Sequence, residues 1–240
     1  MIGLGCDQAD SPGDGLRQHL QDVQGFFRKM RANLPDLVIE NCASGGHRLE
    51  PSFMGLTSMA SFSDVHETRD IPVITANLHR LILPRQSQIW AVLHASDALE
   101  RLVYFLTGGF LGLLCLSGEI TTLDPRQWSL VLEAIQFYQQ VAPVIAHGRS
   151  RLFQYINPSW QHLQGAQAVL RLAKDEQSTL IVTHSFGAPF PAEIHIPLPG
   201  SGWQVADRFP LPVPAPVIMD SRLRYVPSKE WQGAGIYLTH

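Results

Sequence analysis

The stretch "LVIENCASGGHRLEP" at residues 37–51 decides the fold that we expect for this chain. It begins as a short apolar run and passes directly into a carboxylate, an amide, a thiol and two glycines. In parallel α/β folds the reactive side chains lie at the carboxyl ends of buried strands, and a polar cluster that follows an apolar run is typical of that arrangement. A plain strand end with a glycine turn, in which Cys42 is a small buried residue, would produce the same pattern.

Helix-like and strand-like segments alternate around this stretch, from the start of the chain to about residue 147. Apolar residues at three- and four-residue steps predict a helix over residues 15–33. Helices are also expected at residues 96–109 and 124–145, the last with Asp124 as N-cap and Pro125 at the first helical position. The strands are expected at residues 37–39, 59–63, 81–83 and 113–116. Such an alternation predicts an α/β layer with parallel strands.

The pattern changes after His147. Short alternating runs such as "TLIVTHSF" and "GAGIYL", separated by Gly, Pro, Ser and Asn, predict antiparallel strands without a helix. We therefore expect one domain at residues 1–147 and a second at residues 148–240. The proline-rich residues 210–217 are expected to form an extended connector or sheet edge, because proline cannot serve a central strand.

Composition narrows the class of protein. The chain has 240 residues, 45% of them hydrophobic, and a formal net charge of −3, as in an ordinary globular protein with a sizeable core. Without a Lys/Arg run, we expect no nucleic-acid partner. The most apolar run, residues 102–116, is shorter than the roughly 20 residues of a membrane span, so we expect no membrane partner.

The three cysteines, Cys6, Cys42 and Cys115, are widely spaced, which argues against a disulfide framework and a structural zinc site. We accordingly expect no metal and no other cofactor. A reducing compartment is favoured, and the N-terminus shows no basic segment followed by an apolar one, so the expected location is cytoplasmic.

A second predicted strand ends in the same way as the first. In "MASFSDVHET", residues 59–68, Asp64 follows a short apolar run, with His66 and Glu67 beside it. A single Asp at this position is more often a cap or a turn former, and Asp-x-His-Glu is too compressed for a metal site. Two neighbouring strand ends with polar groups are nevertheless stronger evidence for a site than either one.

The order of these blocks resembles the active-site region of the α-galactosidases of glycoside hydrolase family 36. Those enzymes typically read Glu-Asn-Cys-(Ala/Ser)-Ser-Gly-Gly-x-Arg and then Ser-Asp; here "PDLVIENCASGGHRLEP" precedes "SFSD", and Asp64 lies 22 positions after Cys42. The segments "LSGEI" at residues 116–120 and "FYQQVAPVI" at residues 137–145 are similar to the family's last barrel strand and following helix. The similarity also includes the opening "GLGCDQADSPGDGLRQHL".

The resemblance implies the C-terminal half of a (β/α)₈ TIM barrel followed by an antiparallel β-sandwich domain. It implies that Asp64 is the general acid/base of a retaining glycosidase, in which a second carboxyl group about 5–5.5 Å away acts as nucleophile. The residues that it places in the galactose pocket are Asn41, Cys42, Gly45, Gly46 and Arg48. The glycines would let the backbone approach a sugar hydroxyl closely.

Two features depart from the family pattern. Val65-His66-Glu67-Thr68 replaces the Asn-Thr-Asp run that many members carry after Ser-Asp, and no Lys-x-Asp followed by an aromatic, the family's nucleophile motif, occurs in the sequence. We therefore expect a fragment of an enzyme that hydrolyses terminal α-galactosides, inactive by itself. Half a barrel exposes sheet edges, so a missing N-terminal half or a homo-oligomer is the expected partner. The alternative is a non-catalytic galactoside-binding or assembly subunit that pairs with a separate N-terminal half.

Overall fold

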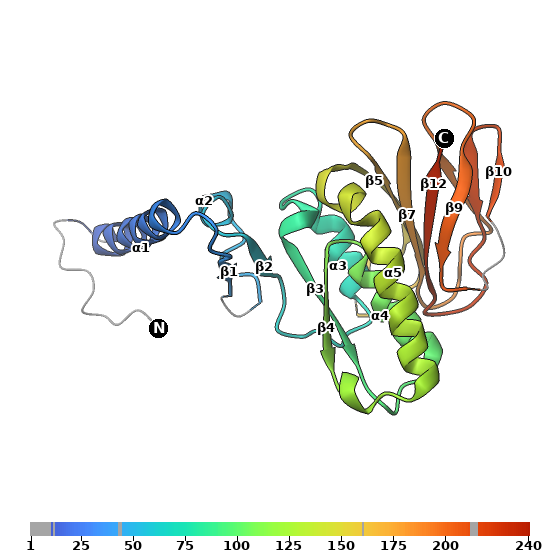
Figure 1. Ribbon diagram of the computed structural model, residues 1–240, viewed down its shortest axis with the longest axis horizontal. Helices are drawn as coiled ribbons and strands as arrows, with labels where there is room; N and C mark the ends of the chain where they lie inside the picture. Colours follow the sequence, from blue (N-terminus) through green and yellow to red (C-terminus); the bar gives the residue numbers. More distant parts are fainter. Residues whose placement is uncertain (1–10, 12, 43–44, 160, 212–215) are drawn as a thin grey trace. The chain divides into compact units, whose positions relative to one another are not determined.

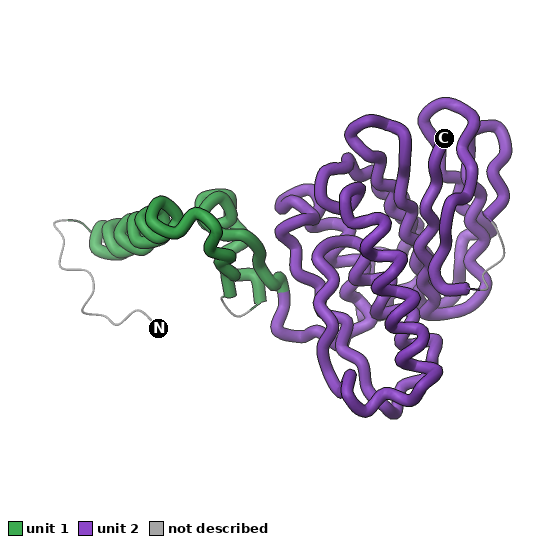
Figure 2. The backbone as a smooth tube through the Cα atoms, viewed as in Figure 1, with its two compact units in different colours: residues 1–62 green, residues 63–240 purple. Residues whose placement is uncertain are grey.

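The computed structural model describes residues 11, 13–42, 45–159, 161–211 and 216–240. The chain divides into two compact units, Met1–Phe62 and Ser63–His240 (Figure 2). The domain boundary expected at residues 147–148 falls inside the second unit, where helix α5 (Pro125–His147) is followed by strand β5 (Arg149–Ile156). Among the described residues, no helix is long and apolar enough to cross a membrane.

The first unit contains helix α1 (Asp14–Asn33), strand β1 (Glu40–Asn41), the single-turn helix α2 (Pro51–Met54) and strand β2 (Met59–Ser61). The strands β1 and β2 pair in parallel. The helix predicted at residues 15–33 is confirmed. The strand expected at residues 37–39 is displaced: ladder pairing begins only at Glu40, and Val38 is 63% exposed.

The second unit begins with alternating helices and strands (Figure 1). Its elements are α3 (Ile71–Leu78), the 3₁₀ turn Pro84–Gln86, β3 (Ser87–Leu93), α4 (Leu99–Gly109), β4 (Leu113–Gly118), the 3₁₀ turn Ile120–Thr122 and α5. The strands β3 and β4 pair in parallel from Gln88 opposite Leu113 to Leu93 opposite Gly118. Parallel pairing, as predicted, is therefore present in both units. The strand predicted at residues 81–83 is wrong, because Pro84 opens a 3₁₀ turn there and the strand follows it.

The remaining strands are all antiparallel. They are β5, β6 (Gly165–Leu172), β7 (Ser178–Ser185), β8 (Ile194–Pro197), β9 (Gln204–Phe209), β10 (Val217–Met219), β11 (Arg222–Tyr225) and β12 (Gly233–Thr239). One sheet has the order β5-β6-β7-β12-β9 and the other β10-β11-β8. Side chains of both sheets, such as Ala168, Ile196 and Leu223, share one buried core. The predicted β-rich C-terminal part is confirmed, although residues 212–215 of its proline-rich segment lie outside the described residues.

Helices α3, α4 and α5 lie between the β3–β4 pair and the five-stranded sheet (Figure 1). Successive side chains of a strand point to opposite faces of the sheet, and both faces of β6 are packed against other elements. Ala168 and Leu170 enter the sandwich core, whereas Gln167 Nε2 donates to the Pro72 carbonyl of α3 at 2.9 Å. Arg171 Nε donates to two carbonyls near the end of α5. The five-stranded sheet is therefore packed on both faces, which fixes the helical layer of this unit to its sandwich.

Candidate active site

The predicted sugar-binding residues lie in the first unit, around the turn that follows β1. Asn41 is buried, and its Nδ2 donates a 2.6 Å hydrogen bond to the Arg48 carbonyl and contacts Met54 Sδ at 3.8 Å. The side-chain amide thus holds the two sides of the turn together. The Arg48 guanidinium lies over the Phe53 ring, 5.5 Å from its centroid.

The two glycines of this turn adopt the left-handed conformation, with φ of 71° at Gly45 and 87° at Gly46. A Cβ on Gly46 would lie 2.9 Å from the Phe62 carbonyl oxygen, so a side chain cannot be placed there without moving the backbone. Cys42 beside the turn is an exposed free thiol. The sequence "HRLEP" continues the turn into α2, where the Glu50 carboxylate caps the helix by accepting from the Ser52 and Phe53 N–H groups.

Asp64 lies at the start of the second unit, on an exposed turn. Ser63 Oγ accepts from the Val65 N–H at 3.0 Å and donates to the Val65 carbonyl at 3.2 Å, which holds the backbone around Asp64 in a tight turn. His66 stacks on the Trp90 indole of β3, with 4.8 Å between centroids. Partial burial lowers the pKa of His66, and the nearby Asp64 charge opposes that effect, so the imidazole is mainly neutral at pH 7.

A group of charged side chains gathers where β3 and β4 end. We call it the rim cluster; it consists of Glu67, His94, Asp97, Arg101 and Glu119. His94 Nε2 lies 3.1 Å from one carboxylate oxygen of Glu67, and its Nδ1 lies 3.7 Å from Glu119 Oε2. Arg101 pairs with Asp97 and with Glu67.

The end of β4 is shaped to bring Glu119 beside His94. Gly118 has a φ of 86°, and a Cβ there would lie 2.3 Å from the Leu93 carbonyl oxygen. The Glu119 N–H donates to that same carbonyl at 2.7 Å. Sequence reasoning missed the rim cluster, although His94 and Glu119 both follow apolar strands directly, as Asp64 was noted to do.

The site residues predicted from the resemblance are therefore divided between the two units. The turn after β1 collects Asn41, Cys42, Gly45, Gly46 and Arg48, whereas Asp64 lies with His66 and the rim cluster in the second unit. The carboxylates and imidazoles of the second unit can exchange protons with a reacting group and hydrogen-bond sugar hydroxyls. Among the described residues, no group of three or more His, Cys, Asp or Glu could hold a metal ion.

A scan of the sequence against models of protein families and a search of curated proteins both gave no match. Solved structures do match. The galactosidase domain of the α-galactosidase–sucrose kinase AgaSK superposes with a TM-score of 0.72 at 13% identity, covering 95% of this chain and 32% of that one. This chain has the fold of the C-terminal portion of an α-galactosidase.

Two further α-galactosidases support the same assignment of the fold. The enzyme from Lactobacillus brevis matches with a TM-score of 0.72 at 14% identity. The match covers 97% of this chain and 33% of the Lactobacillus brevis chain. A variant of the family-36 enzyme AgaA from Geobacillus stearothermophilus, in complex with 1-deoxygalactonojirimycin, has a TM-score of 0.69 at 13% identity. The match covers 97% of this chain and 33% of AgaA. The chain spans about a third of the length of these structures. The resemblance to family 36 is confirmed in the fold.

Proposed function

We propose that this chain is part of a retaining α-galactosidase-type glycoside hydrolase that cleaves terminal α-galactosides, with Asp64 as its general acid/base. One observation carries the proposal: a chain whose fold matches these enzymes over 95–97% of its length also has, from "ENCASGG" to Asp64, the order of residues that resembles the family-36 pattern.

In the proposed mechanism the Asp64 carboxyl group protonates the glycosidic oxygen while a second carboxylate attacks the anomeric carbon. The Asp64 carboxylate then takes a proton from the water that releases galactose. We assign the attacking carboxylate to a part of the enzyme outside this sequence, which has no Lys-x-Asp motif followed by an aromatic. A neutral His66 suits this role for Asp64, because a cation beside it would favour the ionised carboxylate and oppose proton donation.

We further propose that the turn after β1 forms one wall of the galactose subsite. The exposed Cys42 thiol and the backbone of Gly45 and Gly46 would face the sugar. Asn41 would support that wall, since its side chain already binds the Arg48 carbonyl within the turn. The proposed partners are an α-galactoside and the remaining part of the barrel, from a longer or separate chain or from a second copy. The proposed location is cytoplasmic, in agreement with the exposed thiol of Cys42.

The purified chain is expected to bind 1-deoxygalactonojirimycin in a calorimetric titration but to hydrolyse no aryl α-galactoside. If the DNA upstream of the Met1 codon encodes an in-frame Lys-x-Asp-aromatic segment, the longer protein should hydrolyse raffinose. There, Asp64→Asn should lower kcat/KM by about 10²–10⁴-fold, the usual contribution of general acid–base catalysis. Asp22→Asn on the exposed face of α1 is the matched control and should leave kcat/KM unchanged.

Azide separates a catalytic role of Asp64 from a structural one. The Asp64→Asn variant should regain turnover of an aryl galactoside when azide, which needs no general base, replaces water as acceptor. Turnover by the purified 240-residue chain that disappears in Asp64→Asn would contradict our placement of the nucleophile. Binding of 1-deoxygalactonojirimycin without hydrolysis by any longer form would instead support the galactoside-binding or assembly subunit.

A further inference from the structure

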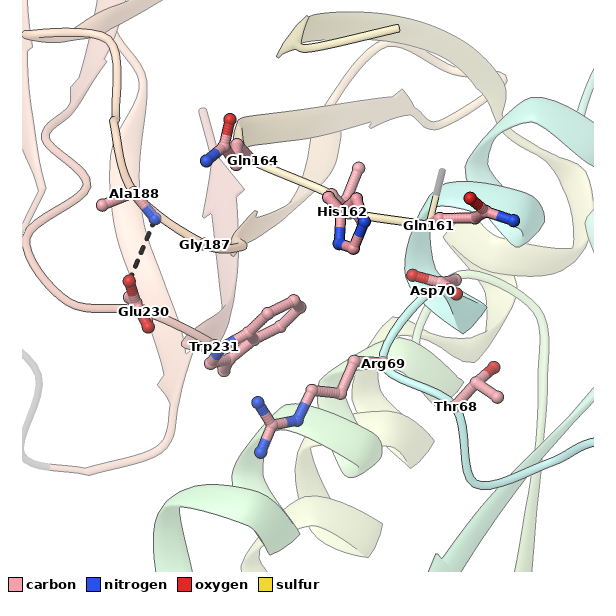
Figure 3. A pocket seen from close by; sticks show the side chains of 11 residues that line it. Thr68, Arg69, Asp70, Gln161, His162, Gln164, Gly187, Ala188, Glu230 and Trp231 are labelled. Carbon is pink, nitrogen blue, oxygen red and sulfur yellow. Dashed lines mark hydrogen bonds between the residues drawn. The ribbon is translucent and has the colours of Figure 1, made fainter. Parts of the chain in front are cut away.

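A pocket of about 510 Å³ lies within the second unit, between the segment that leads into α3 and the loops at one end of the sandwich (Figure 3). Its volume is within the range of roughly 300–1,000 Å³ that is usual for small-molecule sites. Four segments of the chain that are distant in sequence form its walls. They are residues 68–70, 161–164, 187–188 and 230–231.

Trp231, His162 and Asp70 point toward the centre of this pocket (Figure 3). The Trp231 indole is held in place by edge-to-face contacts with Tyr104 and Phe186, whose ring centroids lie 6.1 and 6.4 Å away. The Arg69 guanidinium lies over the indole, 4.7 Å from the ring centroid. A partly exposed aromatic ring therefore stands fixed beside groups that can donate and accept hydrogen bonds.

The charges around the pocket disfavour an anionic ligand. The carboxylates of Asp70 and Glu230 outnumber the single guanidinium of Arg69, which is already stacked on Trp231. Glu230 Oε1 accepts from the Ala188 N–H at 3.1 Å, and this bond joins two of the walls. Asp70 is partly buried, and this burial raises the pKa of its carboxyl group.

A ligand that suits these walls is neutral, has hydroxyl groups for Asp70 and His162, and presents an apolar face to an indole. Saccharides have these properties together. We propose that the pocket between residues 68–70 and the sandwich loops binds a neutral oligosaccharide, at a site separate from the galactose subsite. The unit would then hold carbohydrate at a place where its helical layer and its sandwich meet.

The test uses the full chain, labelled with ¹⁵N-tryptophan and titrated with raffinose in the presence of saturating 1-deoxygalactonojirimycin. The Trp231 indole resonance, assigned with Trp231→Phe, should shift. His162→Ala and Asp70→Ala should each weaken the affinity by about two- to tenfold, the effect of losing one hydrogen bond. His147→Ala at the exposed end of α5 is the matched control and should change the affinity less than twofold.

The His162 side chain is exposed and the Asp70 side chain makes no capping hydrogen bond to α3, so both variants are expected to fold. Raffinose that never shifts the Trp231 resonance, or that binds both variants as tightly as the control, would overturn the proposal. A shift caused by glucose 6-phosphate or inorganic phosphate, but not by raffinose, would also overturn it. A pocket that binds raffinose in a chain that does not bind 1-deoxygalactonojirimycin would support this site while contradicting the galactose subsite.

Discussion

The buried His184 of β7 should make the second unit sensitive to acid. Its ring is fully buried, packs edge-on against Tyr104, and places Nε2 3.3 Å from Thr107 Oγ1. Thr107 Oγ1 donates its own hydrogen within α4, so it accepts the Nε2 hydrogen of a neutral imidazole. Nδ1 has no hydrogen-bond partner among the described residues. A proton added at Nδ1 would therefore create a buried charge without an acceptor, and burial lowers the pKa of His184 to about 3.

The sign of the effect follows from this pKa. Because the folded-state pKa lies below the ordinary value of 6.5, the unfolded chain binds a proton more readily, and the stabilising contribution is complete above pH 6.5 and is lost as the pH falls. Between pH 8 and pH 5 the loss is about 2 kcal/mol, and it approaches about 5 kcal/mol near pH 3. His79, largely buried between Ser150 Oγ and the Leu111 carbonyl with a pKa of about 4, adds a loss of similar size.

The measurement is the free energy of unfolding in urea at pH 8 and at pH 5, for the wild type and for His184→Leu. All five tryptophans lie after residue 62, so their fluorescence follows the second unit. The free energy of unfolding should decrease between pH 8 and pH 5 by about 2 kcal/mol less in His184→Leu than in the wild type. The exposed control His147→Leu should show the same decrease as the wild type. An equal decrease in wild type and His184→Leu would refute the reasoning, because His184 would then not be the group that is neutral only in the folded state.

Two further substitutions test how the second unit is built. Asp124→Ala removes a capping box in which the side chain accepts from the Arg126 and Gln127 N–H groups, and should lower the free energy of unfolding by about 1 kcal/mol. The same urea titration measures this free energy, and an Asp124→Ala variant as stable as the wild type would show that the cap is dispensable. Gly118→Ala forces a Cβ toward the Leu93 carbonyl and should cost about 1–3 kcal/mol, with faster amide hydrogen exchange at the end of β4. A stability equal to that of wild type would mean that the strand end can shift without cost.

The elements that the sequence predicts well are those with strong local signals. The three-to-four-residue apolar spacing of α1 and the Asp124-Pro125 start of α5 both reappear in the structure, the latter with its capping box formed. The antiparallel strands after residue 148 were also predictable, because turn residues separate these short strands regularly, whereas their packing as a sandwich was implied only by the family resemblance. In each case neighbouring residues alone are enough to choose the conformation.

Helix α3 shows where local signals fail. Its sequence "IPVITANL" is apolar and partly β-branched, which favours a strand, yet it is helical. Pro72 fits the first turn of a helix, and Thr75, fully buried, satisfies its hydroxyl by donating to the Ile71 carbonyl. Packing against α4 and β3, together with the hydrogen bond from Gln167 to the Pro72 carbonyl, therefore decides the conformation, which the apolar pattern of these eight residues does not show.

The rim cluster was not predicted because its members meet only through the pairing of β3 with β4. Glu67, His94 and Glu119 are far apart in sequence, and the parallel register places the ends of both strands side by side. Asp64, by contrast, was identified from a family resemblance, and physical reasoning about its neighbours alone had favoured a turn former. The hydrogen bonds of Ser63 around it agree with a turn at this position, and the acid/base role stays a proposal.

The face of β3 that points away from the helices carries buried polar atoms, and it also contacts the turn that holds Asp64. Ile89, Ala91 and Leu93 are almost fully buried, whereas on the other face Gln88 Oε1 and Trp90 Nε1 are buried without a partner among the described residues. Each such atom costs about 1–3 kcal/mol, and folded proteins rarely leave one unpaired. If the parallel strands belong to a (β/α)₈ barrel, as the family resemblance implies, side chains of its other strands would fill the inside and could supply these partners. Because His66 stacks on Trp90 beside Asp64, the strands that satisfy this face would also set the position of the acid/base turn.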